Sequence, residues 1–391
     1  MKYIDDRAIL SSFSAYFLYK RIDIFLFSIK TLIKFIFFSF KLKISHKSGN
    51  TFLIIEEEVS QRRDVQRILK SLKNLFPKKF SKITFDYYYS FNLKQIFYRH
   101  KFLIHYLKNY QRYFLNIEDI LRRQRLNIIN LNIYRFLAIY SLSTYQDMNY
   151  NFKYFPEEVK NIFCFMDMNT LSNTLIQVLI NNDLGYKCYT TQHGFYRSFN
   201  DNKTMTSNEA NIKSIVSNKF LCWGNYTKKL LDDINVNNNL KTLIVGHPLD
   251  IEIKKLDTGY ISVIHDNCTN IVTNRISDKL GENLAIKEKL KLIIHLHPSE
   301  KKGIYHNYSR YGEYVVGRNS ALLMSLILNK NSQIFLHESS FYLECIKSHK
   351  NYLDSNFVFL TKEHKKIIIK THLSDKNRIE IENDYKKIFN L

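Results

Sequence analysis

Polar residues follow apolar runs at several points of this chain, and this recurring pattern constrains the fold more than any other feature. Three such runs lead into Thr191-Gln-His-Gly194, Val245-Gly-His-Pro-Leu-Asp250 and His295-Leu-His-Pro-Ser-Glu300, and a fourth, Val315-Val-Gly-Arg-Asn-Ser320, leads into a helix-like segment. Polar groups so placed are typical of the carboxyl ends of strands in an open α/β sheet, where such sheets bind ligands. The pattern predicts an α/β fold with two Rossmann-like domains whose parallel sheets face each other across a cleft.

Strand-like and helix-like segments alternate along most of the chain, which favours parallel sheets. The 391 residues exceed one ordinary hydrophobic core and suit two domains. We expect a basic and apolar segment at 1–48, an acceptor-binding domain at 49–250, a linker at 251–258, and a nucleotide-donor domain at 259–391 that ends in a closing helix.

The formal net charge is +22, from 58 basic and 36 acidic residues. Nucleic acid, an anionic membrane surface or phosphorylated substrates would each attract such a chain. No RRM, KH or helix-turn-helix signature is present, so we expect no nucleic-acid partner, although nucleic-acid binding stays an alternative. The five cysteines are dispersed without a zinc-like spacing, which predicts free thiols in a reducing compartment.

The apolar and aromatic stretch at residues 22–40 is interrupted by Asp23, Lys30 and Lys34. A lysine at mid-bilayer costs roughly 2.5–3.5 kcal/mol, which disfavours a membrane span. Lys30, Lys34 and Lys41 fall on one face of a helix, which predicts a helix lying in the membrane interface. A core helix with an exposed lysine stripe and a true span are the alternatives.

Residues 87–140 are basic and aromatic with helical spacing, and they include Arg99, His100 and Lys101. This stretch is either an exposed cationic surface for lipid phosphates or a helical layer with a solvated basic face. Both interpretations place positive charge on the surface of the N-terminal half.

The Gln192-His193-Gly194 motif offers a catalytic base. Glycine allows a sharp turn after the strand, and a histidine presented there has a pKa suited to general base catalysis. A structural role for His193 is the alternative. Further cleft residues after other strands are expected to be Gly246, His247, Asp266, Ser339 and Ser340.

Two motifs of the C-terminal half suit a nucleotide phosphate. In the first, His297 and Pro298 end a strand, and Glu300 follows where it can bond a ribose hydroxyl. In the second, Gly317, Asn319 and Ser320 form a strand-to-helix turn whose backbone N–H groups favour an anion; an ordinary N-cap role for Ser320 is the alternative.

Other nucleotide and metal signatures are missing from the sequence. No GxxxxGK[ST] or GxGxxG occurs, so P-loop and nicotinamide-binding classes lose their support. Asp167 follows a strand-like run without the second carboxylate that would help it hold Mg²⁺. We therefore expect no metal and no cofactor, with the nucleotide-activated donor acting as a substrate.

The order of these motifs resembles that of bacterial glycosyltransferases of the GT-B type. The order is Gln-His-Gly, Trp-Gly, Gly-His-Pro-Leu-Asp, His-Pro-x-Glu, and Gly-x-x-Ser before a helix. More narrowly, it is similar to that of capsule Kdo transferases, bacterial sialyl- and polysialyltransferases, and teichoic-acid glycerophosphotransferases. The resemblance covers Asn161 to Leu360, about half of the chain.

The resemblance implies a cleft between two Rossmann-like domains, no essential metal, and contacts from His297 and Ser320 to a cytidine nucleotide phosphate. Sialyltransferases carry an acidic pair plus glycine where this chain has Gln192-His193-Gly194, which favours a histidine base here. They also carry Ser-Ser or Ser-Thr where this chain has Asn319-Ser320, which leaves one hydroxyl unless Ser339-Ser340 is the counterpart.

We therefore expect an inverting glycosyltransferase of capsule or lipopolysaccharide synthesis, peripheral on the cytoplasmic face of the inner membrane. It would transfer a sugar from a CMP-sialic acid or CMP-Kdo type of donor to a membrane-associated glycan or glycolipid. Its other expected partners are the anionic membrane surface and further polysaccharide-synthesis proteins. A CDP-polyol phosphotransferase and a non-catalytic GT-B scaffold in polysaccharide export are the alternatives.

Overall fold

The structure is a computed structural model that describes most of the chain. The described residues are 33, 37, 39–45, 52–56, 63–75, 80–108, 143–165, 170–182, 185–192, 194–196, 212–234, 240–248, 253–266, 271–296, 310–349, 352–354 and 356–388. The chain forms two compact units. Unit 1 comprises residues 1–193, 199–222 and 228–243, and unit 2 comprises residues 194–198, 223–227 and 244–391.

Unit 1 contains a seven-stranded sheet in the order β1-β3-β2-β4-β5-β6-β7. Strand β2 is parallel to both of its neighbours, and β4, β5 and β6 continue in the same direction, whereas β1 is antiparallel to β3 at the edge. The strands are β1 (Ser39–Ser45), β2 (Phe52–Glu56), β3 (Phe80–Ser90), β4 (Asn161–Cys164), β5 (Lys187–Thr191), β6 (Lys219–Cys222) and β7 (Lys241–Ile244).

The helices of this half of the chain include α7, which packs on one face of the sheet with the helix at residues 143–151. Ile162, Cys164 and Cys188 of the strands share a buried core with Leu175 and Leu179 of α7. Besides the helix at 143–151, this half contains α3 (Arg63–Leu75), α4 (Leu93–Lys108), η3 (Phe152–Tyr154), α7 (Thr170–Asn181) and α9 (Asn225–Ile234).

Unit 2 contains a six-stranded sheet in the order β12-β13-β11-β10-β8-β9. Strands β9, β8, β10 and β11 are parallel, and β13 and β12 extend the sheet in antiparallel pairing. The strands are β8 (Leu256–Ile264), β9 (Lys291–His295), β10 (Tyr311–Gly317), β11 (Gln333–His337), β12 (Tyr352–Asp354) and β13 (Phe357–Phe359). The helices are α10 (Ile271–Glu288), α11 (Ala321–Ile327), η5 (Phe341–His349), α12 (Lys362–Leu373) and α13 (Arg378–Ile388).

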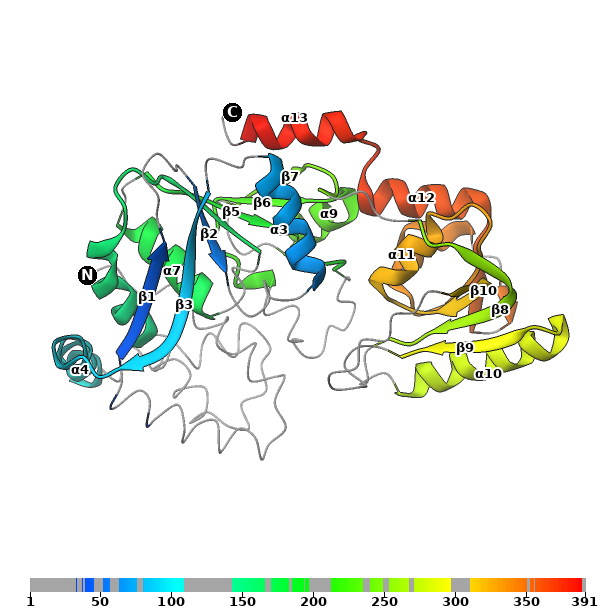
Figure 1. The fold of residues 1–391 in the computed structure, drawn as a ribbon, viewed down its shortest axis with the longest axis horizontal. Coiled ribbons are helices and arrows are strands. Elements are labelled where there is room, and N and C mark those ends of the chain that lie inside the picture. The colour runs from blue at the N-terminus through cyan, green and yellow to red at the C-terminus, as the bar shows by residue number, and fades with distance from the viewer. Residues whose placement is uncertain are drawn as a thin grey trace. The chain divides into compact units, whose positions relative to one another are not determined.

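Both faces of the unit 2 sheet are covered, as expected for parallel strands. Because side chains alternate along a strand, Val316 packs toward α10, whereas its neighbour Val315 packs with α11 and α12. Figure 1 shows α10 lying along the sheet beside β9. Each unit is therefore an α/β layer structure with a mainly parallel sheet, which confirms the predicted α/β fold with two Rossmann-like domains.

The two units share one strand order. In unit 1 the sequence β3-β2-β4-β5 repeats the arrangement β9-β8-β10-β11 of unit 2. In both, the strand that comes first in the chain (β2 or β8) lies in the middle. The next strand in the chain (β3 or β9) lies on one side of it, and the one after that (β4 or β10) lies on the other side. This is the doubly wound order of nucleotide-binding sheets, with a switch point beside the first strand.

Several expectations about the N-terminal half are corrected. Residues 39–45 form strand β1, whose backbone at Lys41 lies opposite Asp86 of β3. The segment 1–48 is therefore not separate from the sheet, and Lys41 does not share a helix with Lys30 and Lys34. Lys30 and Lys34 themselves lie outside the described residues. None of the helices in the part of the chain described above is long and apolar enough to cross a bilayer.

Two other boundaries also differ from the predicted ones. Strand β8 begins at Leu256, inside the expected linker 251–258, because the strand continues into the polar residues before Tyr260. The expected helical layer at 87–140 begins as strand up to Ser90, and residues 109–142 lie outside the described ranges. Arg99, counted among the surface cations, is instead buried.

Candidate functional site

The carboxyl ends of the parallel strands in unit 2 bring several polar side chains together. After β8, the chain adds β9 on one side and then β10 on the other, so the switch point lies between β8 and β10. Ligands of doubly wound sheets bind at this point, outside the carboxyl ends of the strands. The residues that follow β8 and β10 therefore form the candidate ligand-binding site of unit 2.

Asp266, two residues past β8, is bonded to the first two polar side chains that follow β10, Arg318 and Asn319. Its Oδ2 lies 3.4 Å from a terminal nitrogen of Arg318 and 3.4 Å from Nδ2 of Asn319. Its backbone N–H donates to Oδ1 of Asn274 at 3.0 Å, at the start of α10. The carboxylate thus holds the β10 loop against the β8 loop across the switch point.

Arg318 is the cationic group of this cluster. The guanidinium presents five N–H donors in a planar fork that matches phosphate oxygens. Its side chain is mostly buried, and so is that of Asp266. Their attraction is therefore less screened than that of a surface pair. The arrangement can present a fixed positive group to an anion at the strand ends.

Asn319 and Ser340 join the loops after β10 and β11. Asn319 Oδ1 accepts the backbone N–H of Phe341 at 3.0 Å, and Ser340 Oγ donates to the carbonyl of Arg318 at 2.6 Å. Both side chains were predicted in the site, and the structure brings them together. They hold Arg318 and Ser320 in place through the backbone.

Ser320 is the N-cap of α11, which follows Gly317 at the end of β10. Its Oγ accepts the backbone N–H of Leu322 at 3.1 Å, which is the capping geometry offered above as the alternative to phosphate binding. Its carbonyl accepts the hydroxyl of Tyr342 at 2.9 Å. Burial raises the pKa of the Tyr342 phenol, so this group stays a donor.

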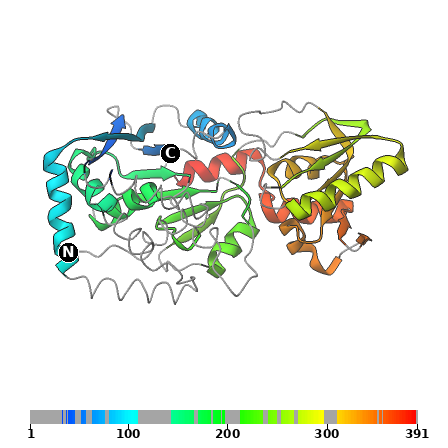
Figure 2. The same ribbon diagram turned by 90° about the horizontal axis from the view of Figure 1, so that it is seen from below.

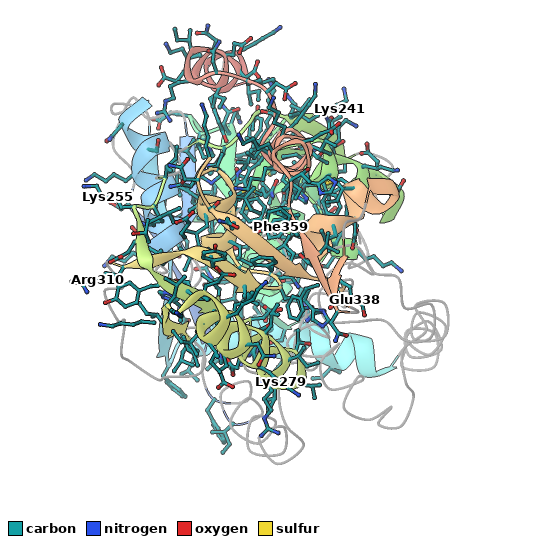
Figure 3. All side chains as sticks on the ribbon, turned by 90° about the vertical axis from the view of Figure 1, so that its right-hand side faces the viewer. Lys241, Lys255, Lys279, Arg310, Glu338 and Phe359 are labelled. Carbon is teal, nitrogen blue, oxygen red and sulfur yellow. The ribbon has the colours of Figure 1, made fainter. Side chains whose placement is uncertain are left out.

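His337, the last residue of β11, forms a local pair with Ser339. Nδ1 of His337 accepts the backbone N–H of Ser339 at 3.2 Å and lies 2.8 Å from its Oγ. Since a backbone N–H can only donate, the proton of the neutral ring belongs on Nε2. In Figure 3, Glu338 lies at this carboxyl edge, whereas Lys255 and Arg310, at the amino ends of β8 and β10, lie on the other side.

His295 ends β9 and belongs to the core. Its Nε2 lies 2.9 Å from Ser262 Oγ, its ring stacks on Tyr311 at 5.0 Å, and burial lowers its pKa to about 4. The neighbouring His265 lies on the carboxyl edge, with Nε2 2.8 Å from Asp278 Oδ1. The first histidine of the His295-Leu-His-Pro-Ser-Glu300 motif therefore has a structural role in the core.

The Gly246-His247 motif is explained by its packing in unit 2. Gly246 has φ +78, and a Cβ there would lie 2.7 Å from Ile381 Cγ1 of α13. The His247 ring packs edge-on against Trp223, with centroids 4.2 Å apart. Arg378 of α13 donates to the carbonyl of Pro248 at 2.7 Å. The motif docks the last helix.

The Gln-His-Gly motif spans the chain's passage from one unit to the other. Gln192, buried in unit 1, donates its backbone N–H to Leu221 at 2.9 Å. Gly194 belongs to unit 2, where Phe195 packs against Trp223 and Tyr342. Four predicted site residues lie outside the described ones, namely His193, His297, Pro298 and Glu300, and so does Asp167, for which no metal role was expected. Within the ranges given above, no group of three or more His, Cys, Asp or Glu side chains is placed to hold a metal.

Sequence reasoning overlooked Arg318, Asn274 and Tyr342. Arg318 stands inside a motif that was quoted, and its position directly after Gly317 could have marked it. Asn274 and Tyr342 act through contacts with Asp266 and Ser320 that no sequence spacing reveals.

Comparison with known proteins adds one distant likeness. No protein-family model and no curated protein matches the chain. Among solved structures, it is similar to the N-terminal domain of trehalose-6-phosphate phosphatase from Candida albicans. The identity is 10%, the match covers 93% of this chain and 89% of that one, and the TM-score is 0.38. The fold class rests on the sheets of the chain itself.

Proposed function

We propose that the chain is a GT-B glycosyltransferase that takes a sugar from a cytidine-nucleotide donor of the CMP-sialic acid or CMP-Kdo type. The observation that carries the proposal is the Asp266–Arg318–Asn319 cluster at the switch point of the unit 2 sheet. A doubly wound sheet binds nucleotides there, and a held arginine suits their phosphate. The motif order in the sequence supports the donor class.

In this proposal the reaction is a direct, metal-independent displacement that inverts the sugar. The acceptor hydroxyl attacks the anomeric carbon, its proton passes to His193, and the bond from that carbon to the phosphate oxygen breaks. The electron pair leaves with the nucleotide. Arg318 and His297 stabilise the phosphate, and Glu300 bonds the ribose. Fixed donors of this kind lower a barrier by several kcal/mol.

The proposed acceptor is a membrane-associated glycan or glycolipid of capsule or lipopolysaccharide synthesis. The protein would reach it from the cytoplasmic face of the inner membrane, together with other polysaccharide-synthesis proteins. A net charge of +22 supports this location because anionic lipids attract basic chains.

Thermal unfolding in the presence of CMP, CDP, UDP, GDP or ADP tests the donor class. A ligand at about 100 times its Kd stabilises the folded state by about 2.7 kcal/mol. We expect CMP or CDP to raise the Tm selectively; a preference for CDP would point to a CDP-polyol. A response to UDP or GDP alone would overturn the cytidine donor, and silence across the panel would favour the scaffold or nucleic-acid alternatives.

Two pairs of matched variants locate the site. Arg318 and Arg310 flank the same strand, at its carboxyl and amino ends. Arg318→Gln should abolish the nucleotide-induced shift, and Arg310→Gln should preserve it. Ser320 and Thr361 each cap a helix of unit 2 by accepting one backbone N–H. Both alanine variants lose about 1 kcal/mol of capping energy, but only Ser320→Ala should also weaken the nucleotide response.

A further inference from the structure

Helix α4 exposes a row of large apolar side chains. Leu93, Phe97 and Ile104 are 66%, 74% and 55% exposed, and Phe91, just before the helix, is 66% exposed. At 3.6 residues per turn, positions 93, 97, 101 and 104 fall within a sector of about 80°. Figures 1 and 2 show α4 (cyan) beyond the end of β3, at the margin of its unit.

The opposite side of α4 is held against unit 1. Arg99 is buried and its terminal nitrogen lies 3.2 Å from Asp147 Oδ2. Tyr98 Oη lies 3.4 Å from Asn149 Nδ2, and Asn92 Oδ1 accepts the backbone N–H of Gln95 at 3.2 Å, at the start of the helix. The Arg99 and Tyr98 contacts fix the rotation of α4 against residues 147–149, so its apolar row is kept on the outside.

The charged residues of α4 itself are all basic. Lys101 is exposed within the row and Lys94 beside it. The sequence holds no aspartate or glutamate from Tyr87 to Ile117. Ile33 and Phe37, one helical turn apart and also in unit 1, are 48% and 53% exposed. Exposed Phe, Leu and Ile side chains with interspersed lysines fit the interface of an anionic bilayer.

We propose that α4 is a membrane-docking helix. Its apolar row enters the interface of an anionic phospholipid bilayer, while Lys94 and Lys101 lie among the lipid phosphates. The charge favours lipid over a second copy of this chain, because two copies of a basic face repel each other. This inference deepens the proposed function by naming the surface that meets the membrane. It rests on that function only to explain why the protein binds a membrane, where the proposed acceptor lies.

Co-sedimentation of the full chain with vesicles tests the apolar row. We expect binding to vesicles of phosphatidylcholine mixed with phosphatidylglycerol, and much weaker binding to phosphatidylcholine alone. Leu93→Ser with Phe97→Ser should lower the partition coefficient at least about tenfold. The control is Val272→Ser with Ile286→Ser on α10, where the side chains are 72% and 79% exposed and α10 also carries acidic residues. This control should bind as the unmodified protein does.

Charge variants test the lipid phosphates separately. Lys94→Gln and Lys101→Gln should each weaken binding about fivefold, an effect that added salt removes. Lys279→Gln and Lys287→Gln on α10 are the matched controls and should have no effect. All four lysine side chains are exposed, so we expect these substitutions to leave the Tm unchanged. An unchanged Tm will show that each variant is folded.

Three outcomes would overturn the proposal. One is absence of binding to the anionic vesicles, and another is full binding by the Leu93→Ser/Phe97→Ser variant. The third is a dimer in sedimentation that this variant dissociates, which would make α4 an interface between copies of the chain. No nucleotide is present in these assays. A variant that loses vesicle binding should keep its nucleotide-induced Tm shift, so failure here is distinct from failure of the transferase proposal.

Discussion

Arg99 and Asp147 form an ion pair whose side chains are only 2% and 4% exposed. Burial lowers the pKa of the guanidinium, and the nearby carboxylate opposes this effect. Removing one member of such a pair leaves a buried charge without compensation, which typically costs 3–5 kcal/mol. The pair therefore holds α4 against the helix at residues 143–151, and we expect the loss of either charged group to destabilise unit 1.

We predict that Asp147→Ala lowers the free energy of unfolding by about 3–5 kcal/mol. The comparison is Asp375→Ala, which removes the exposed pair with Lys370 and should change stability by less than about 1 kcal/mol. Urea denaturation measures both. Equal effects of the two substitutions would show that the buried pair contributes no more than a surface pair.

At the scale of elements, the strand ends were the most predictable feature. The run that leads into the Gln192-His193-Gly194 motif forms strand β5 (Lys187–Thr191), as the polar residues and glycine after it predicted. The extent of helix α10, from Ile271 to Glu288, was harder to predict. Its buried side includes Asn274, Ser277 and Gly281, so its packing face looked like a polar surface in the sequence.

For the candidate site, the residues could be predicted from the sequence but their contacts could not. Asp266, Asn319, Ser320 and Ser340 were all predicted from their places after strands. Contacts among these segments lie at one sheet edge, while their binding of a donor stays a prediction. Which atoms pair could not be read from spacing, because Asp266 and Asn319 are 53 positions apart and meet only when β8 and β10 are neighbours. The His-Gly and Gly-His motifs looked alike, yet Gly246 serves the packing of α13.

The docking of α13 gives a prediction at this scale. Gly185 and Gly246 both have positive φ, but a Cβ meets nothing within 4 Å at Gly185 and meets Ile381 at Gly246. Alanine in the left-handed region costs about 1–2 kcal/mol at either position. Gly246→Ala should lose about 1–3 kcal/mol more, because the new methyl displaces Ile381. Urea denaturation of both variants gives the difference.

A second substitution isolates the contact itself. If the extra loss comes from Ile381, combining Gly246→Ala with Ile381→Ala should cost less than the sum of the two single changes. Strict additivity would assign the loss to the backbone at Gly246 alone, and α13 would then not depend on the glycine.

For the whole molecule, acid sensitivity should originate in unit 2. His295 and His372 both lie in this unit, and burial lowers their pKa values to about 4 and about 3. The His372 ring packs among aromatic side chains that include Tyr226, Phe341 and Tyr342. Each ring is therefore neutral in the folded protein well below the pH at which a free histidine takes up a proton.

The sign of the pH dependence follows from this difference. A histidine in the unfolded chain binds a proton near pH 6.5, whereas these two in the folded chain do so only near pH 4 and 3. Between those values the unfolded state holds more protons. Stability is therefore complete above about pH 6.5 and falls as the pH drops, by about 1.4 kcal/mol per pH unit for each histidine.

His372→Phe keeps an aromatic ring in this aromatic cluster and removes one of the two titrating groups. We predict that it roughly halves the loss of unfolding free energy that these two histidines cause between pH 6 and pH 4.5, since one proton fewer is taken up on unfolding. Urea denaturation across this range measures the slope, and His295→Gln provides the parallel test at β9. If both variants kept the slope of the unmodified protein, these two histidines would not be the source of its acid sensitivity.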